Sequence, residues 1–486
     1  MDGKIIELRQ KRRRVPSGPA AAGDSEADIA FAERLHHDHN ADVRWCPGLG
    51  WLLWDGRRFA LDETSQIVAR AEESVRRVHL DAYRETNPER RQFLGKLATH
   101  YSKIERVRGA LEFLKPRVAV KIDDLDSDLF SFNVANGTID LRTGALRPHD
   151  RADLITKLSA IEYSPDAPAP RWEQFLDEVF AGDAKQADAS DAKQAGADVI
   201  GYVQRLFGYA LTASQRDHVL AFLCGPGSNG KSVLTRLMLS VAGEYGQVAP
   251  ESLFMKQYGD QIPVDVARLR GARLVVASES QEAERLDEGK VKKLSGSDPI
   301  SARFMRQNIF EFQPSHHLFL QSNHRPVIAG QDFGIWRRIK LINFGVRFAD
   351  PEAGKTAPEP PVRRADHELA EKLMGELPGI LNWAVKGAKE WFESGLRDPK
   401  TVIEDTKAYR REEDVLTDFI ESRCDVGAEL RVDVGSLWTA YRDWSVEEGI
   451  KTWSKNKFSR RLTEAGHVSD REAARTKLGI ALKGKL

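Results

Sequence analysis

Residues 225–232 have the sequence Gly225-Pro226-Gly227-Ser228-Asn229-Gly230-Lys231-Ser232, and this stretch decides the fold of the centre of the chain. Four apolar residues, 221–224, precede it and predict a buried strand, while the residues from Val233 onward predict a helix. Glycines let backbone N–H groups converge on an anion, the lysine can reach the β and γ phosphates, and the serine hydroxyl can bind Mg²⁺. We therefore predict that residues 225–233 form a phosphate-binding loop for ATP and Mg²⁺.

Composition sets wide bounds on function. The 486 residues are enough for about three domains. Lys+Arg 73 balances Asp+Glu 73, so any contact with nucleic acid must come from local clusters of charge. The three cysteines lie far apart, which excludes a cysteine-based zinc site and a disulfide framework and is typical of a reducing cytoplasm. No apolar run approaches the ~18 residues of a membrane span, so we expect no membrane partner.

Two later apolar stretches end in polar side chains that suit hydrolysis of ATP. Residues 273–278 predict a buried strand that ends at Glu279, which we expect to activate the attacking water and to share Mg²⁺ with Ser232. A solvated glutamate at a strand end is the alternative for Glu279. Residues 317–322 predict another strand, and it ends at Asn323, whose amide can orient that water.

Two consecutive arginines, Arg337 and Arg338, follow the Asn323 strand. An arginine in this place can project into the nucleotide site of a neighbouring copy and neutralise charge in the transition state. Either arginine could instead form a salt bridge within its own subunit, so the sequence leaves open which of the two acts on a neighbour.

The loop, the two strands and the arginines, all between residues 225 and 338, resemble the superfamily 3 helicases of the AAA+ class. Residues 136–144, 276–279 and 293–300 resemble more narrowly the poxvirus-type primase-helicases of phages and plasmids. The resemblance implies a homo-hexameric ring in the cytoplasm of a bacterial host, which translocates 3′ to 5′ on single-stranded DNA and unwinds forked DNA beside a separate primase or polymerase. Ser278 stands where viral members often have a second acid, which shifts metal binding toward Ser232 and water.

A predicted hairpin lies between the two motif strands. Residues 300–304 and 310–312 alternate in polarity around a basic, polar tip. In the family that the chain resembles, this hairpin points into the ring channel and grips DNA phosphates. The resemblance implies that role here for Lys292, Lys293, Arg303, Arg306 and Gln307. An ordinary exposed hairpin is the alternative.

The C-terminal residues predict three helices and a terminal strand pair at 467–468 and 478–482, which together suggest a winged helix-turn-helix. Basic residues on or just before its third helix are the candidates for contact with DNA, and further basic residues lie on the wing; a solvated helix face is the alternative. The helix candidates are Lys455, Lys457, Arg460 and Arg461, and those of the wing are Arg471, Arg475 and Lys477.

The predicted fold is α/β, with an AAA+ P-loop NTPase core between an α+β N-terminal domain and a C-terminal winged helix. The alternative function is an ATP-dependent initiator or loader that assembles on an origin without processive unwinding. The predicted segments are a disordered basic tail (1–27), the N-terminal domain (28–165), a hinge helix and linker (166–198), the core (199–345), a helical lid or connector (346–412) and the winged helix (413–486).

Overall fold

The computed structural model describes residues 24–180, 189–256, 264–278, 284–302, 310–328, 330, 332–350, 362–450, 452–468 and 476–484. The chain divides into two compact units. The first consists of the residues up to Ile139 together with Leu146–Leu158, and the second of Asp140–Ala145 together with the residues from Ser159 onward. Residues 1–23 of the predicted tail lie outside the described residues, and residues 24–27, also assigned to that tail, are helical.

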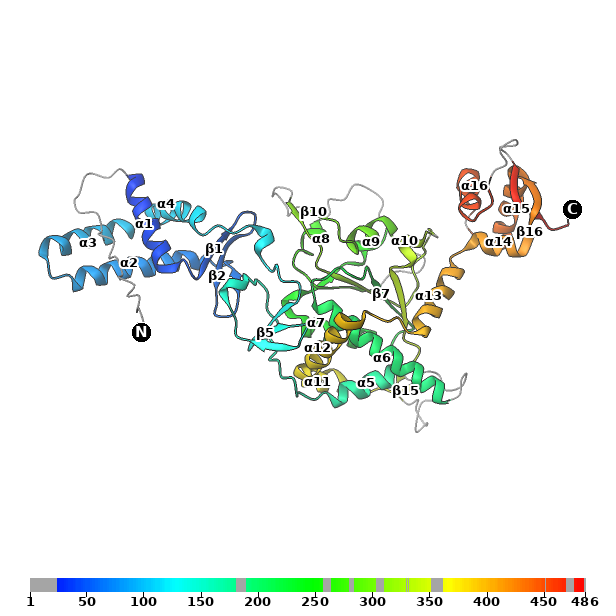
Figure 1. Ribbon diagram of the computed structural model, residues 1–486, viewed down its shortest axis with the longest axis horizontal. Helices are drawn as coiled ribbons and strands as arrows, with labels where there is room; N and C mark the ends of the chain where they lie inside the picture. Colours follow the sequence, from blue (N-terminus) through cyan, green and yellow to red (C-terminus); the bar gives the residue numbers. More distant parts are fainter. Residues whose placement is uncertain are drawn as a thin grey trace, which may run out of the picture. The chain divides into compact units, whose positions relative to one another are not determined.

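The first unit combines helices with two small sheets (Figure 1). Helix α2 buries Ile67, Ala71, Val75 and Val78 along one face because these positions recur every three to four residues. Residues 52–54 pair antiparallel with residues 59–61 and form a hairpin around Asp55. The elements are α1 Asp24–His39, β1 Val43–Cys46, β2 Gly50–Trp54, β3 Phe59–Leu61, α2 Gln66–Arg84, α3 Pro88–Tyr101, α4 Ile104–Leu114, β4 Ser131–Val134, β5 Gly137–Asp140 and β6 Ala145–Arg147.

The second unit is built on a five-stranded parallel sheet with the order β13-β7-β12-β9-β8. Strand β7 (Leu220–Cys224) is buried along its whole length, as strands covered on both faces usually are. The predicted strands before Glu279 and Asn323 are confirmed as β9 and β12. Besides β7, the sheet contains β8 Gly246–Ala249, β9 Leu274–Ser278, β12 His317–Ser322 and β13 Ile339–Asn343.

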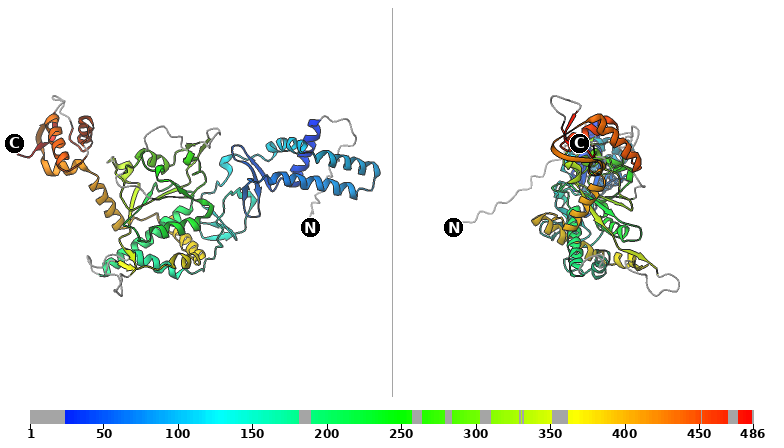
Figure 2. Two further views of the ribbon diagram at one scale, coloured as in Figure 1. Left: turned by 180° about the vertical axis from the view of Figure 1, so that it is seen from behind. Right: turned by 90° about the vertical axis from the view of Figure 1, so that its right-hand side faces the viewer.

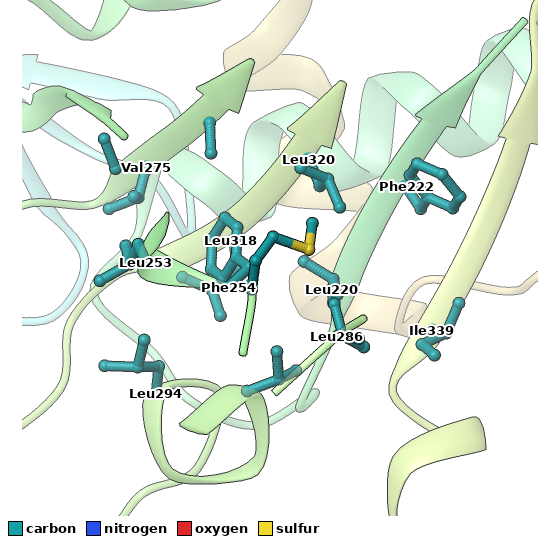
Figure 3. Packing of buried hydrophobic residues seen from close by; sticks show 14 of the residues in the cluster. Leu220, Phe222, Leu253, Phe254, Val275, Leu286, Leu294, Leu318, Leu320 and Ile339 are labelled. Atoms are coloured by element: carbon teal, nitrogen blue, oxygen red, sulfur yellow. The ribbon is translucent and has the colours of Figure 1, made fainter. Parts of the chain in front are cut away.

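Alternate residues of these strands pack against different helices. Leu220, Phe222, Leu318 and Leu320 point to one face, where they meet the apolar side chains between residues 253 and 294 (Figure 3). The intervening residues of the same strands face helices of the opposite layer, where the ring of His317 lies 4.0 Å from that of Tyr209. Both faces are therefore covered, which leaves the strand ends as the accessible part of the sheet.

Helices α6 and α12 pack side by side in the second unit (Figure 2). A Cβ atom on Gly208 or Gly387 would collide with backbone atoms of the facing helix, so glycine permits this close approach. The helices and remaining strands of this unit before residue 413 are α5 Pro170–Phe180, α6 Ala189–Leu211, α7 Lys231–Ala242, α8 Val264–Ala267, α9 Glu288–Leu294, β10 Ile300–Ala302, β11 Phe310–Phe312, α10 Phe333–Trp336, β14 Arg347–Ala349, β15 Val362–Arg364, α11 Leu369–Met374, α12 Leu377–Ser394 and α13 Lys400–Glu412.

The linker prediction is wrong for residues 189–198, which form the first turns of α6. Alanine has the highest helix propensity, and the long apolar remainder of α6 can extend a helix into this Ala-rich stretch. Residues 181–188 of that linker lie outside the described residues.

The C-terminal residues form three helices and a two-stranded sheet. The predicted terminal hairpin is wrong in its partner: the last strand pairs antiparallel with residues 424–433, and residue 468 contributes one backbone hydrogen bond, from Leu478 N–H to its carbonyl. The strand at residues 424–433 was not predicted, because Gly427 interrupts its alternation of apolar and polar residues. The elements are α14 Val415–Arg423, β16 Cys424–Asp433, α15 Val434–Glu447, α16 Lys455–Glu464 and β17 Thr476–Leu482. Within the described part of the chain, no helix is both long and apolar enough to cross a bilayer.

Candidate nucleotide-binding site

The glycine-rich loop lies at the carboxyl edge of the parallel sheet. Cys224, the last residue of β7, is level with Ser322 of β12, and Gln321 is level with Ser278 of β9. Three strands therefore end side by side, and the polar residues that follow them share one edge. Ligands of open parallel sheets bind at this edge.

The backbone of the loop turns sharply into helix α7. Ser228 and Gly230 have positive φ angles of 58° and 91°, and α7 begins at Lys231. This helix has 12 residues, and the N–H groups of its first turn have no partner within the helix, so they direct a partial positive charge toward the loop. Ser232, on the first turn, is exposed and can offer its hydroxyl to a cation beside a bound anion.

Gly225 is a position of the loop where a side chain cannot be accommodated. Its φ is 153°, and a Cβ atom would collide with the carbonyl oxygen of Phe344 and lie 2.6 Å from the Asn229 amide nitrogen. Phe344 is itself fixed, because its N–H donates to the Cys224 carbonyl at 2.8 Å. The loop is thus held against the chain segment that follows β13.

We expect Gly225→Ala to destabilise the second unit by about 1–3 kcal/mol and to weaken binding of ATP, because backbone atoms must move. Gly227→Ala is the matched control, since a Cβ atom there meets nothing within 4 Å. Thermal melting and titration with a fluorescent ATP analogue measure the two effects. Equal melting temperatures and equal affinities of the two variants would contradict the loop geometry.

Lys231 connects the loop to the strand that carries Asn323. Its side chain is 5% exposed, and Nζ donates to the Gly225 carbonyl at 2.6 Å, to Asn229 Oδ1 at 3.0 Å and to Asn323 Oδ1 at 3.0 Å. Burial lowers the pKa of this ammonium below its ordinary value. A negatively charged phosphate oxygen can replace these neutral oxygens as the partner of the ammonium. Its charge would stabilise the protonated lysine that burial disfavours.

A buried chain of hydrogen bonds, which the sequence did not predict, supports the same edge. Thr235 Oγ1 on α7 donates to Gln321 Oε1 at 2.7 Å, and Gln321 Nε2 donates to Ser278 Oγ at 2.9 Å. Helix α7 is thereby tied to the ends of β12 and β9. The available signal was a polar pair: a threonine one helical turn after Lys231 and a glutamine inside an apolar strand.

Glu279 lies outside the described residues, whereas its predecessor Ser278 is the last residue of β9. Its predicted roles as base and Mg²⁺ ligand, with Ser232, stay predictions. Across the described ranges, no group of three or more acidic, histidine or cysteine residues could hold a metal ion.

The two candidate arginines differ in environment. Arg338 is 8% exposed, and its guanidinium donates to Ser295 Oγ at 3.1 Å and to the Gly334 carbonyl at 2.6 Å. Burial and the charge of Arg337 lower the pKa of Arg338. Arg337 is exposed. Both precede β13, so they lie at the opposite edge of the sheet from the loop.

The hairpin before β12 is confirmed as β10 and β11, paired antiparallel with Ile300 opposite Phe312. Its tip, with the candidates Arg303, Arg306 and Gln307, lies outside the described residues. Lys293 is exposed at the end of α9. The Lys292 ammonium, by contrast, contacts both carboxylate oxygens of Asp332, at 2.8 and 2.7 Å, which engages its charge within the unit.

The basic residues of α16 lie around one tryptophan. Lys457 Nζ is 4.3 Å from the centre of the Trp453 ring, and Arg461 stacks on the same ring at 6.0 Å. Lys455 and Arg460 are exposed. On the wing, Arg471 and Arg475 lie outside the described residues, and Lys477 is buried and donates to Thr463 Oγ1 at 2.5 Å. Lys477 is therefore unsuited to the predicted contact with DNA.

Three family models match parts of the chain. "D5 N terminal like" matches residues 31–181, a family of unknown function matches residues 223–338, and "Poxvirus D5 protein-like" matches residues 411–475. Models of the two D5 types thus match both ends of the matched region.

Curated viral proteins are similar to this chain over 66% of its length. Proteins named "Putative helicase" from Acanthamoeba polyphaga mimivirus and Frog virus 3 are 28% and 24% identical to it, and the alignments cover 33% and 39% of those proteins. One named "Putative primase" from African swine fever virus is 23% identical over 34% of its length. The chain therefore spans less than two fifths of the length of these relatives. The chain is therefore similar to D5-type models and to proteins that are named as helicases or primases.

Among solved structures, the C-terminal region of NrS-1 is similar to this chain. One apo structure of that region, residues 305–718, has a TM-score of 0.38 and 12% sequence identity, and the match covers 70% of this chain and 87% of that one. Another form has a TM-score of 0.36 at 10% identity, with 66% and 77% of the two chains covered.

Proposed function

We propose that this chain is an ATP-dependent DNA helicase of the superfamily 3 AAA+ class, which translocates 3′ to 5′ on single-stranded DNA and unwinds forked DNA during replication. The observation that carries the proposal is the contact between Lys231 Nζ and Asn323 Oδ1, 3.0 Å, at the carboxyl edge of the parallel sheet. A phosphate bound by the lysine would lie beside the amide that is suited to orient water.

The roles of the site residues follow from this arrangement. Backbone N–H groups of residues 225–233 bind the phosphates, and Lys231 binds the β and γ oxygens. Ser232 and Glu279 would hold Mg²⁺, which would neutralise charge at the phosphates. Glu279 accepts the proton of the attacking water, and Asn323 fixes the position of that water. Cys224 and Phe344 hold the base of the loop through the backbone hydrogen bond described above.

The position of Arg337 supports an assembly of several copies. Residues 339–343 of β13 run parallel to β7, level with residues 220–224. A five-residue strand is about 16 Å long, so an arginine before β13 lies about that far from the loop of its own chain. An arginine that neutralises the γ-phosphate must come from a neighbour, and a closed ring gives every copy such a neighbour. We propose a homo-hexamer.

The hairpin β10–β11 and the C-terminal helices are the proposed contacts with DNA. Lys293, Arg303, Arg306 and Gln307 would bind backbone phosphates in the ring channel, where electrostatic contact independent of sequence suits a translocating motor. Three helices with a two-stranded sheet support a winged helix whose Lys455, Lys457 and Arg460 face DNA. Arg461 is 9% exposed, so it is not proposed as a contact. The proposal places the protein in the cytoplasm of a bacterial host, encoded by a phage, prophage or plasmid, with a separate primase or polymerase.

An ATP-dependent initiator or loader is the second candidate, because the basic helix α16 could serve assembly on an origin alone. A forked duplex with a labelled 3′ tail separates the two functions. We expect ATP-dependent strand release from this substrate, with little release from a blunt duplex as the matched control. Binding and assembly on the fork without strand release would favour the initiator and contradict the helicase.

A further inference from the structure

A basic cavity of about 300 Å³ lies at the edge of the sheet opposite the phosphate-binding loop. Three segments contribute to its lining: residues 216–219 directly before β7, Arg337 and Lys340 on either side of the start of β13, and residues 396–398 between α12 and α13. Arg337, the candidate for action on a neighbouring copy, is therefore one of several charged residues in a defined cavity.

The cavity has an excess of positive charge. Four cationic side chains, from Arg216, Arg337, Lys340 and Arg397, face two carboxylates, Asp217 and Asp398. The pKa of His218, which also lines the cavity, is lowered mainly by burial and further by the positive charges of Arg338 and Arg337. The neutral imidazole is therefore favoured. A cavity with this balance attracts an anion.

Two of the four cations are already engaged. Arg216 stacks on the Trp391 ring at 4.2 Å and donates to the Trp391 carbonyl at 2.7 Å, and Lys340 donates to Asp398 at 2.5 Å. Arg337 and Arg397 are exposed, and no ion pair joins either of them to another described residue. These two guanidinium groups supply the uncompensated charge.

The backbone at Arg397 is held in a conformation that is unusual for a residue with a side chain. Its φ is 52°, in the left-handed region, and such residues persist where the surroundings fix them. The Arg205 guanidinium fixes this backbone, because it donates to the Leu396 carbonyl at 2.9 Å and to the Arg397 carbonyl at 3.4 Å. With Asp398 bound to Lys340, the segment is anchored on both sides of Arg397.

We propose that this cavity receives the terminal phosphates of ATP held on the loop of a second copy, with Arg397 acting beside Arg337. The inference rests on the proposed function and names a second residue of the shared site. Two guanidinium groups offer the paired N–H donors that match phosphate oxygens, and their position at the far edge of the sheet excludes contact with the loop of their own chain.

Arg397→Ala in the full chain tests the proposal. Turnover of ATP is expected to fall about 100-fold, with binding of ATP to the variant's own loop within about twofold of the wild type. Lys400→Ala, an exposed lysine three residues away and outside the cavity, is the matched control and should retain wild-type turnover. Arg397→Gly relieves the left-handed backbone and guards against misfolding, so it should lose turnover without a lower melting temperature.

A mixing experiment distinguishes action on a neighbour from action within one chain. Mixed assemblies of Lys231→Ala and Arg397→Ala copies contain interfaces where an intact loop meets an intact Arg397, so turnover should exceed that of either variant alone. Turnover that remains at the average of the two variants, or wild-type turnover by Arg397→Ala, would overturn the inference. A wild-type chain that neither assembles nor hydrolyses ATP would instead contradict the proposed function itself.

Discussion

Lys231→Ala is expected to lower the turnover of ATP about 100- to 1000-fold. The Lys231 ammonium donates to oxygens of residues 225, 229 and 323. Its removal therefore deletes the charged donor that connects the loop with Asn323. Loss of one pre-arranged donor to developing charge has an effect of this size. Release of inorganic phosphate at saturating ATP measures the result.

The matched control for this variant is Lys386→Ala, which removes an exposed lysine from helix α12 and should leave turnover unchanged. Circular dichroism and thermal melting establish that both variants are folded. Wild-type turnover by folded Lys231→Ala would mean that the loop does not bind the reacting phosphates.

Arg337→Ala and Arg338→Ala are expected to fail in different ways. Removal of the exposed Arg337 should lower turnover about 1000-fold in the assembled protein and leave the melting temperature unchanged, because a transition-state arginine contributes little to folding. Arg338 is buried and donates to Ser295 and Gly334, so its removal should destabilise the second unit by about 1–3 kcal/mol.

The two variants serve as controls for each other, since they change the same residue type at adjacent positions. Turnover measured beside urea denaturation separates a loss of catalysis from a loss of folded protein. A stable, inactive Arg338→Ala together with an active Arg337→Ala would reverse the assignment and make Arg338 the residue that reaches a neighbour.

Much of the parallel sheet was predictable from short-range pattern. A continuous apolar run followed by glycines predicts β7 and its loop, and apolar runs that end in polar residues predict β9 and β12. The apolar residues of helix α2 recur every three to four positions, which is also a local pattern. These elements are fixed by local sequence, because each must bury an apolar face or terminate at residues that break regular structure.

The remaining features depend on partners that are distant in the sequence. The strand β16 is hard to recognise because its solvent-facing residues are mostly polar, and only its pairing with β17 defines it. Similarly, Arg338 donates a hydrogen bond to Ser295, which is 43 positions away and which the sequence does not identify as a neighbour. The contact between Thr235 and Gln321 also joins residues 86 positions apart.

The central claim is that ATP is hydrolysed at a site shared by two copies of this chain. Mass photometry of the wild type with a non-hydrolysable ATP analogue and single-stranded DNA tests it most directly. The account predicts a closed assembly of six 54.5 kDa chains, about 327 kDa plus the DNA, that depends on the nucleotide. A single 54.5 kDa chain under all conditions, with undiminished turnover of ATP, would contradict it.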